Sequence, residues 1–285
     1  MSSLRNVWKR CLILAALVLL LPLCGLAWLF HGTDASVPVL NYHQINNIAQ
    51  NSLTIRTDQF EEQMKYLSEN GYHTITPTEM LDAWENGTEL PDKPVIITFD
   101  DGYVDNYQNA FPILEKYRLK ATIFLISDYM GMYPNYLTWD QAKQMQQSGL
   151  IQLESHTLNH ADLTKLDSTE EIRHELYGSK QAIEFQLGNT VQYIAYPCGA
   201  YTQEIADLTQ AAGYRAAFTV NYGWADPNEQ HFILDRVPIF GGISPIFLRF
   251  KLRLAYAPVI APLSRLREQL SSDGYTSLAD LIPVP

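Results

Sequence analysis

Short apolar runs alternate with amphipathic stretches along most of this 285-residue sequence, and this alternation restricts the fold more than any other feature. Seven short runs predict strands, at 39–42, 95–99, 121–126, 151–153, 193–196, 216–220 and 233–237. Six stretches with helical spacing predict helices, at 58–70, 77–85, 106–117, 138–148, 168–187 and 202–212. Strands that alternate with helices form parallel sheets with the helices outside.

The pattern therefore predicts an α/β fold. Seven such units in about 210 residues favour a distorted (β/α) barrel of about seven strands. An open doubly wound sheet is the alternative, although no Gly-x-Gly-x-x-Gly follows the first strand. Thr57 precedes the first predicted helix as a capping residue, and glycines follow several helices as stop signals.

Residues 11–30 contain no charged side chain and directly follow a basic cluster of Arg5, Lys9 and Arg10. Twenty apolar residues span the hydrocarbon core of a bilayer, about 30 Å. The basic flank predicts a cytoplasmic N-terminus and an exported remainder. We therefore expect a single-pass transmembrane helix at the cell membrane, with the rest of the chain extracellular. A signal peptide cleaved near the small-x-small sequence at 25–27 is the alternative.

The charge of the exported part excludes one class of partner. Residues 31–285 hold 17 basic and 31 acidic side chains, a net charge of −14. Neutralisation of phosphates supplies most nucleic-acid affinity, so a nucleic-acid partner is not expected. Cys198 is the single cysteine after residue 30, so this part holds no internal disulfide.

The C-terminal segment differs from the rest in its charge. Residues 244–267 contain five basic side chains and no acidic one, interleaved with large apolar residues. Such a segment can lie on an anionic membrane surface. It can equally be a closing helix packed on the acidic domain. The sequence thus divides into an anchor at 1–30, a spacer at 31–36, a main domain at 37–243 and a basic amphipathic segment at 244–285.

Two adjacent carboxylates, Asp100 and Asp101, end the second predicted strand in the sequence Thr-Phe-Asp-Asp-Gly. The C-terminal ends of parallel strands are where barrels and open α/β sheets place their active sites. Repulsion between the carboxylates favours binding of a cation to one of them.

A pair of histidines, His156 and His160, follows the fourth predicted strand. Histidines four residues apart can bind one metal ion from a single turn of backbone. Together with Asp101 they make three ligands and leave a position open, as catalytic zinc sites require. Asp100 is then spare and lies beside the metal, where a general base for hydrolysis is needed.

These motifs resemble those of the NodB-homology polysaccharide deacetylases, carbohydrate esterase family four. The family's Thr-Phe-Asp-Asp-Gly is complete at 98–102, and its His-[Ser/Thr]-x-x-His is complete at 156–160. The resemblance covers roughly residues 37–239. It implies a distorted (β/α) barrel in which Asp100 is the base and Asp101, His156 and His160 bind a divalent metal, usually Zn²⁺.

The third motif departs from the family's Arg-x-Pro-Tyr-Gly. The arginine that commonly pairs with the base is replaced by Ala195, and the tyrosine by Cys198, between Pro197 and Gly199. The resemblance assigns this stretch to the oxyanion hole, through a backbone N–H that a change of side chain preserves. The Tyr-Pro-x-Gly form is similar to the branch that includes the poly-N-acetylglucosamine deacetylases.

The family's closing Leu-x-His, which supplies the catalytic acid, is absent from the C-terminal part. In the poly-N-acetylglucosamine branch the order of the motifs looks circularly permuted, which makes His43 at the end of the first strand the candidate acid. A buried structural histidine is the alternative. By the same resemblance Arg236 replaces the missing guanidinium near Asp100. Trp224, after a predicted strand, is the best candidate among the aromatic residues for stacking on a sugar ring.

The sequence thus predicts a metal-dependent hydrolase that removes N-acetyl groups from an extracellular or cell-wall polysaccharide containing N-acetylglucosamine. An O-acetyl esterase acting on xylan is one alternative, because members of the family share the site. A catalytically weak glycan-binding protein is another, given Ala195 and Cys198, although binding alone does not need the retained Asp100.

Overall fold

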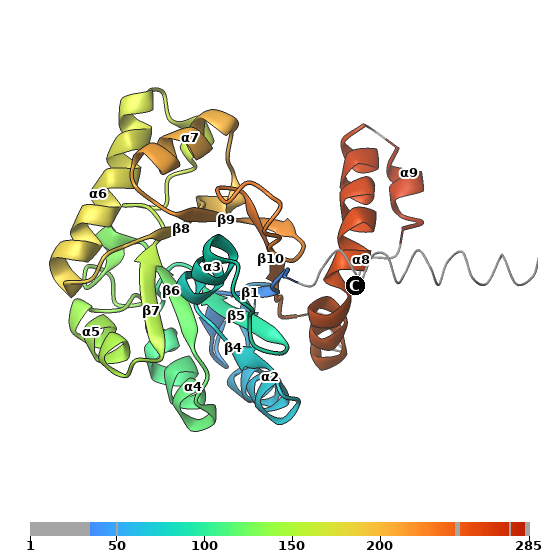
Figure 1. Cartoon of the computed structure of the whole chain (residues 1–285), viewed down its shortest axis with the longest axis horizontal. Coiled ribbons are helices and arrows are strands. Elements are labelled where there is room, and N and C mark those ends of the chain that lie inside the picture. Colours follow the sequence, from blue (N-terminus) through green and yellow to red (C-terminus); the bar gives the residue numbers. More distant parts are fainter. Residues whose placement is uncertain (1–34, 50, 243–245, 274, 283–285) are drawn as a thin grey trace, which may run out of the picture. The chain divides into compact units, whose positions relative to one another are not determined.

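Seven parallel strands form the closed ring that the sequence predicts (Figure 1). The computed structural model describes residues 35–49, 51–242, 246–273 and 275–282, within a compact unit that begins at Ala35. The strands of the ring are β1 (Val39–Tyr42), β5 (Pro94–Phe99), β6 (Ala121–Leu125), β7 (Ile151–Ser155), β8 (Tyr193–Ala195), β9 (Ala216–Tyr222) and β10 (Leu234–Pro238).

Strand β1 closes the ring, because it pairs with β5 on one side and with β10 on the other. Leu40 of β1 is in register with Ile97 of β5 on one side and with Val237 of β10 on the other. This closure rules out the open doubly wound sheet. Three short strands lie outside the ring: β4 (His73–Thr74) pairs with β5, and β2 (Gln44–Ile45) pairs with β3 (Thr54–Ile55).

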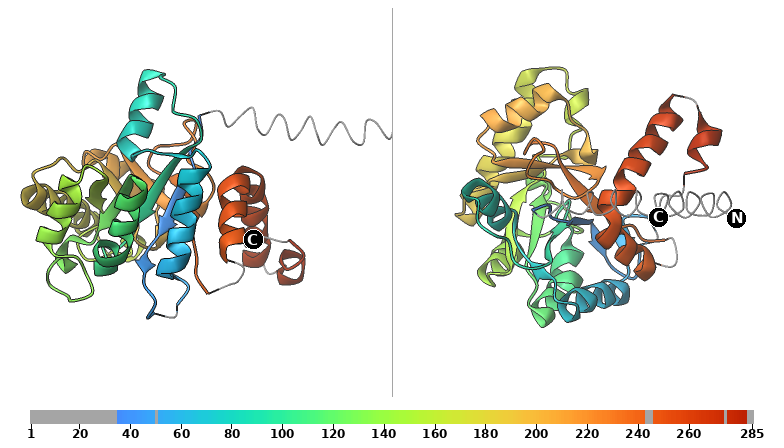
Figure 2. Two further views of the ribbon diagram at one scale, coloured as in Figure 1. Left: turned by 90° about the horizontal axis from the view of Figure 1, so that it is seen from below. Right: turned by 45° about the vertical axis from the view of Figure 1, so that its right-hand side comes forward.

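The helices follow the predicted stretches closely, and most of them surround the ring (Figures 1 and 2). They are α2 (Thr57–Glu69), α3 (Pro77–Asn86), α4 (Phe111–Tyr117), α5 (Trp139–Gln147), α6 (Thr169–Leu187) and α7 (Gln203–Ala211). Two details of the prediction were wrong. Thr57 is the first helical residue rather than the cap, which is Arg56 without a side-chain hydrogen bond. The predicted helix 106–117 begins as a π-helical turn, Asn106–Ala110, before α4.

The alternation of side chains along the strands produces two separate cores. Inward-facing residues fill the ring together with Met80 and Leu81 of α3, which covers its N-terminal end. The inward apolar residues of the strands include Val39, Ile96, Phe124, Tyr193, Phe218 and Leu234. Outward-facing residues such as Leu40 and Ile97 pack against the surrounding helices. Successive side chains of a strand point to opposite faces, so one sequence supplies both cores.

The basic C-terminal segment forms a 27-residue helix, α8 (Ile246–Ser272), followed by α9 (Thr276–Ala279). One face of α8 is buried through Phe250, Leu254, Ala257 and Ala261, whose spacing of three to four residues defines a single stripe. α8 thus packs against the domain, and contact of its other face with a membrane stays a prediction.

The membrane anchor predicted at 11–30 lies outside the described residues. Within the part of the chain that the structure describes, no helix is both long enough and apolar enough to cross a bilayer. The cell-membrane location and the extracellular orientation stay predictions from the sequence.

Candidate active site at the mouth of the barrel

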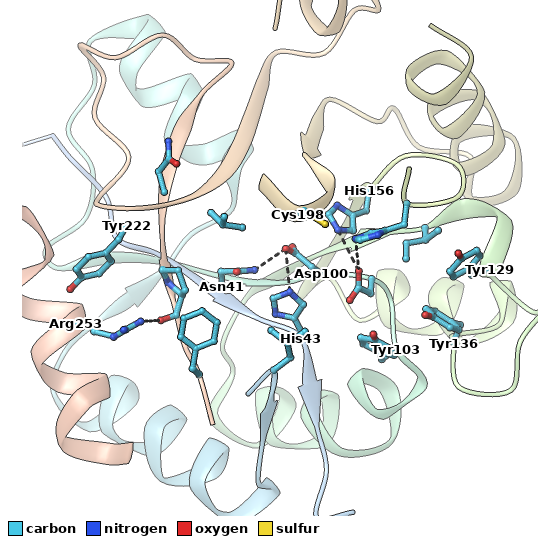
Figure 3. A pocket seen from close by; sticks show the side chains of 18 of the residues that line it. Asn41, His43, Asp100, Tyr103, Tyr129, Tyr136, His156, Cys198, Tyr222 and Arg253 are labelled. Atoms are coloured by element: carbon cyan, nitrogen blue, oxygen red, sulfur yellow. Dashed lines mark hydrogen bonds and ion pairs between the residues drawn. The ribbon is translucent and has the colours of Figure 1, made fainter. Parts of the chain in front are cut away.

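Polar side chains occupy the last inward positions of the strands, above the apolar core of the ring. Along β1 the inward Val39 is followed by Asn41 and then His43, and along β5 the inward Ile96 leads to Asp100. Parallel strands end at the same side of a barrel, so these side chains meet at one mouth. Figure 3 shows them around a common cavity.

Asp101, His156 and His160 lie together at this mouth. Asp101 Oδ1 is 3.4 Å from His156 Nε2 and 3.5 Å from His160 Nε2. Asp101 and His160 both have left-handed backbone conformations, with φ of 74° and 63°, which turn their side chains back toward the cavity. Non-glycine residues in this region are uncommon and are often found at functional sites.

The donor set fits a divalent transition metal. The ligand atoms of the three residues all lie within 4.8 Å of one another, and tetrahedral zinc with bonds of about 2.0–2.1 Å places its ligands about 3.3 Å apart. His156 Nδ1 lies 2.7 Å from the Ala195 carbonyl. Because a carbonyl only accepts, Nδ1 carries the proton and Nε2 presents its lone pair to the cavity.

Asp100 forms a buried, bidentate ion pair with Arg236 of β10. Arg236 Nη1 donates to Oδ1 at 2.8 Å and Nη2 donates to Oδ2 at 2.7 Å, while Asn41 Nδ2 also donates to Oδ2. Burial is the largest single influence and would raise the pKa of Asp100, but the charge and hydrogen bonds of Arg236, together with the nearby His156 and His43, outweigh it and hold the pKa well below its usual range. Asp100 is therefore an ionised carboxylate at neutral pH.

His43 faces Asp100 across the cavity, with its Nε2 3.9 Å from Asp100 Oδ2. Its backbone carbonyl accepts a hydrogen bond from Asn106 Nδ2 at 2.8 Å, which fixes the end of β1 against the π-helical turn. Burial lowers the pKa of His43 below its ordinary value, and the negative charge of Asp100 offsets only part of that shift.

The third motif forms a tight turn beside the cavity. Cys198 lines the cavity and is left-handed, with φ of 57°. Its neighbours Pro197 and Gly199 are buried. A Cβ on Gly199 would lie 2.3 Å from the Val220 side chain and 2.7 Å from its backbone nitrogen, so only glycine fits. The turn thus holds the backbone of Cys198 at the wall of the cavity that His156 and His160 also line.

Trp224 is not brought to the site. Its indole Nε1 donates to the Leu254 carbonyl of α8 at 3.2 Å, and the residue is absent from the walls of the cavity. The substrate-stacking role predicted for Trp224 therefore finds no support in its position. Three tyrosines line the cavity instead on the side of His156, namely Tyr103, Tyr129 and Tyr136 (Figure 3).

No pattern in the sequence singles out Glu175, which holds the histidine loop in place. This buried residue of α6 accepts hydrogen bonds from the backbone N–H of Leu158 at 3.0 Å and of Asn159 at 3.2 Å, and from Asn159 Nδ2 at 2.7 Å. In the sequence it is one acidic residue among several on an amphipathic helix. Asn41, which donates to Asp100, could not be predicted either, because its role depends on a contact between two strands of the ring.

A parallel barrel whose mouth carries an Asp-His-His donor set beside an ionised aspartate is suited to metal-assisted hydrolysis. The sequence model of the polysaccharide deacetylase family matches residues 87–217. This range includes Asp100, Asp101 and both histidines, whereas His43 and Arg236 lie outside it.

The chain is also similar to individual members of that family. It is 38% identical over 218 residues to YxkH of Bacillus subtilis (strain 168), described provisionally as a polysaccharide deacetylase, with 76% of each chain covered. It is 26% identical over 232 residues to the poly-beta-1,6-N-acetyl-D-glucosamine N-deacetylase of Staphylococcus aureus (strain MRSA252), covering 72% of this chain and 79% of the relative.

The solved structure of the Streptococcus pyogenes deacetylase PplD in complex with acetate superposes with a TM-score of 0.70 at 32% identity, covering 75% of this chain and 96% of that one. The protein belongs to the polysaccharide deacetylase family, whose members are hydrolases.

Glu175 provides a test of how the site is held. Glu175→Ala leaves two backbone N–H groups and the Asn159 amide without their acceptor, so the histidine loop should loosen. We expect metal affinity to fall about 10- to 100-fold, the usual effect of losing a residue that orients a ligand. Competition with a chromophoric chelator measures this affinity.

Two variants serve as controls for this test. Glu175→Gln keeps an acceptor oxygen and should lose less affinity, and Glu170→Ala, on the exposed side of the same helix with a side chain 85% accessible, should lose none. Equal affinities in the wild type and Glu175→Ala would contradict the positioning role.

Proposed function

We propose that this protein is a metal-dependent N-deacetylase of a polysaccharide that contains N-acetylglucosamine. The observation that supports this most strongly is the ionised Asp100, clamped by Arg236 beside the Asp101, His156 and His160 donor set and facing His43. A family relative carries the name of a poly-N-acetylglucosamine deacetylase, which supports the class of substrate.

Asp101, His156 and His160 would hold the metal, with Zn²⁺ the ion that this donor set suits best. When bound, such an ion polarises a carbonyl oxygen and lowers the pKa of water. His156 is oriented for this role by the Ala195 carbonyl, and the loop that carries both histidines is oriented by Glu175.

Asp100 is the general base in this proposal. It lies one residue from Asp101 and is ionised, so it can accept the proton of an attacking water at the mouth of the barrel. The two hydrogen bonds from Arg236 and the one from Asn41 fix the carboxylate so that it cannot rotate away from the cavity. Because the base is already oriented, no further entropy has to be lost to orient it during the reaction.

His43 is the general acid, on the side of the cavity opposite the histidine loop. An amine leaves only after it receives a proton, and the imidazole Nε2 faces the cavity at 3.9 Å from Asp100. The backbone N–H of Cys198, held by the tight turn, would stabilise the negative charge that develops on the acetyl oxygen. The products are acetate and a free amine on the sugar.

The choice between an N-deacetylase and an O-acetyl esterase can be tested with the full-length protein loaded with Zn²⁺. We expect acetate from N-acetylglucosamine oligomers, together with one new primary amine for each acetate, and at least about tenfold slower release from acetylated xylan. An enzyme-coupled acetate assay and an amine-reactive dye measure the two products. Release from xylan alone would overturn the proposal.

His43→Ala tests the role of the acid through the leaving group. An amine needs the proton, whereas nitrophenolate leaves without it, so the variant should lose about 10²- to 10⁴-fold on N-acetylglucosamine oligomers and much less on nitrophenyl acetate. The imidazole is protonated only below its pKa, which lies below the ordinary value. The wild-type rate on oligomers should therefore fall as pH rises through that pKa, and this dependence should vanish in His43→Ala. Equal losses on both substrates would show that His43 has a structural role.

A further inference from the structure

The cavity extends well beyond the residues that the proposed chemistry uses. Its volume is about 720 Å³, toward the upper part of the range for ligand sites, about 300–1,000 Å³. On the side away from the three tyrosines it is lined by the ends of β9 and β10 and by α8, through Val220, Asn221, Tyr222, Pro238, Phe240, Arg253 and Ser264. In Figure 3 Tyr222 and Arg253 lie on one side of His43 and Asp100, and the tyrosines lie on the other.

Phe240 is an exposed aromatic side chain on a rigid backbone. It is 40% exposed, yet its two neighbours are fixed: Ile239 N donates to the Asn41 carbonyl and Gly241 N donates to the Ser52 carbonyl, each at 2.9 Å. A Cβ at Gly241 would lie 1.9 Å from the Thr54 carbonyl oxygen, so this backbone contact requires glycine. The ring of Phe240 is therefore held in the wall of the cavity.

Arg253 of α8 fixes the rings of this wall. Its Nη1 donates to the Pro238 carbonyl at 2.6 Å, and its Cζ lies 5.4 Å from the ring centroids of both Tyr222 and Phe240. Guanidinium groups at this distance attract aromatic faces. The helix itself is anchored through its buried stripe, so the wall is preformed.

The chemistry of this wall matches a sugar ring. A pyranose has an apolar C–H face, which suits an aromatic plane such as Phe240, and a rim of hydroxyl groups, which suits polar side chains such as Asn221 and Ser264. The proposed chemistry uses only the residues around Asp100 and the candidate metal ligands, which leaves the wall of Phe240, Tyr222 and Arg253 available to a neighbouring sugar of the same chain.

We propose that Phe240, with Tyr222 and Arg253, forms a binding subsite for the sugar unit next to the one that is deacetylated. This inference rests on the proposed function, and it makes the C-terminal helix part of the substrate site. Because aromatic residues flank Asp100 on both sides, the unit that reacts is an internal one. The preferred substrate is then an oligomer rather than the monosaccharide.

The test compares the full-length wild type with Phe240→Ala, and with Phe185→Ala as control, since Phe185 is an 87% exposed aromatic residue on α6 outside the cavity. Acetate release is measured on N-acetylglucosamine oligomers of one to five units, in both the β-1,4- and β-1,6-linked series, and on nitrophenyl acetate. The wild-type kcat/KM should rise with chain length. Phe240→Ala should lose about fivefold to tenfold more on the pentamer than on the ester, and Phe185→Ala should match the wild type. A length dependence in Phe240→Ala equal to that of the wild type would overturn the subsite.

Binding measured without turnover separates this inference from the proposed function. Calorimetry with the pentamer compares Asp100→Asn with the double variant Asp100→Asn, Phe240→Ala. A dissociation constant about fivefold to tenfold weaker in the double variant supports the subsite even if the wild type releases no acetate, a result that would overturn only the proposed function. Equal affinities, or no binding by either protein, would overturn the subsite.

Discussion

The buried ion pair between Arg236 and Asp100 lies at the mouth of the barrel, and the other residues of the candidate site surround it. The guanidinium is fully buried, and it also donates through Nε to the Thr219 carbonyl at 2.7 Å and lies over the Phe124 ring at 5.7 Å. A buried ion pair is weak evidence for stability, because desolvation offsets the attraction, yet removal of one partner costs about 3–5 kcal/mol. Its effect here is to fix an ionised carboxylate one residue from the metal-ligand candidate Asp101.

Closure of the ring makes this pair possible. Asp100 and Arg236 are 136 residues apart in the chain, and β1 lies between their strands. The same strand brings Asn41 and His43 to Asp100. The candidate base is therefore surrounded by residues from the start of the domain, Asn41 and His43, and by Arg236 from its end. In a cyclic sheet a strand occupies the same place whether it comes first or last in the chain. This explains how His43, near the start of the sequence, lies opposite the histidine loop.

The strands, the barrel and the motif residues could be predicted from the sequence, because each depends on local patterns. All seven predicted strands occur in the ring, since runs of apolar residues bounded by turn residues have few alternative structures. What could not be predicted depends on contacts between distant segments. Glu175 and Asn41 gain their roles from partners on other elements, and Trp224, predicted as a substrate contact, is hydrogen-bonded to α8. The contribution of α8 to the cavity could not be predicted, because amphipathic spacing indicates that one face of a helix is buried but does not identify the elements that it contacts.

The central claim is a division of labour between adjacent carboxylates, with Asp101 holding the metal and Asp100 moving the proton. Metal content and acetate release, measured on the same preparations of Asp100→Asn and Asp101→Asn, test it most directly. Asp100→Asn should retain about one metal ion per chain and lose about 10²- to 10⁴-fold in turnover, whereas Asp101→Asn should lose metal and turnover together. Loss of metal from Asp100→Asn, or full occupancy in Asp101→Asn, would contradict the account.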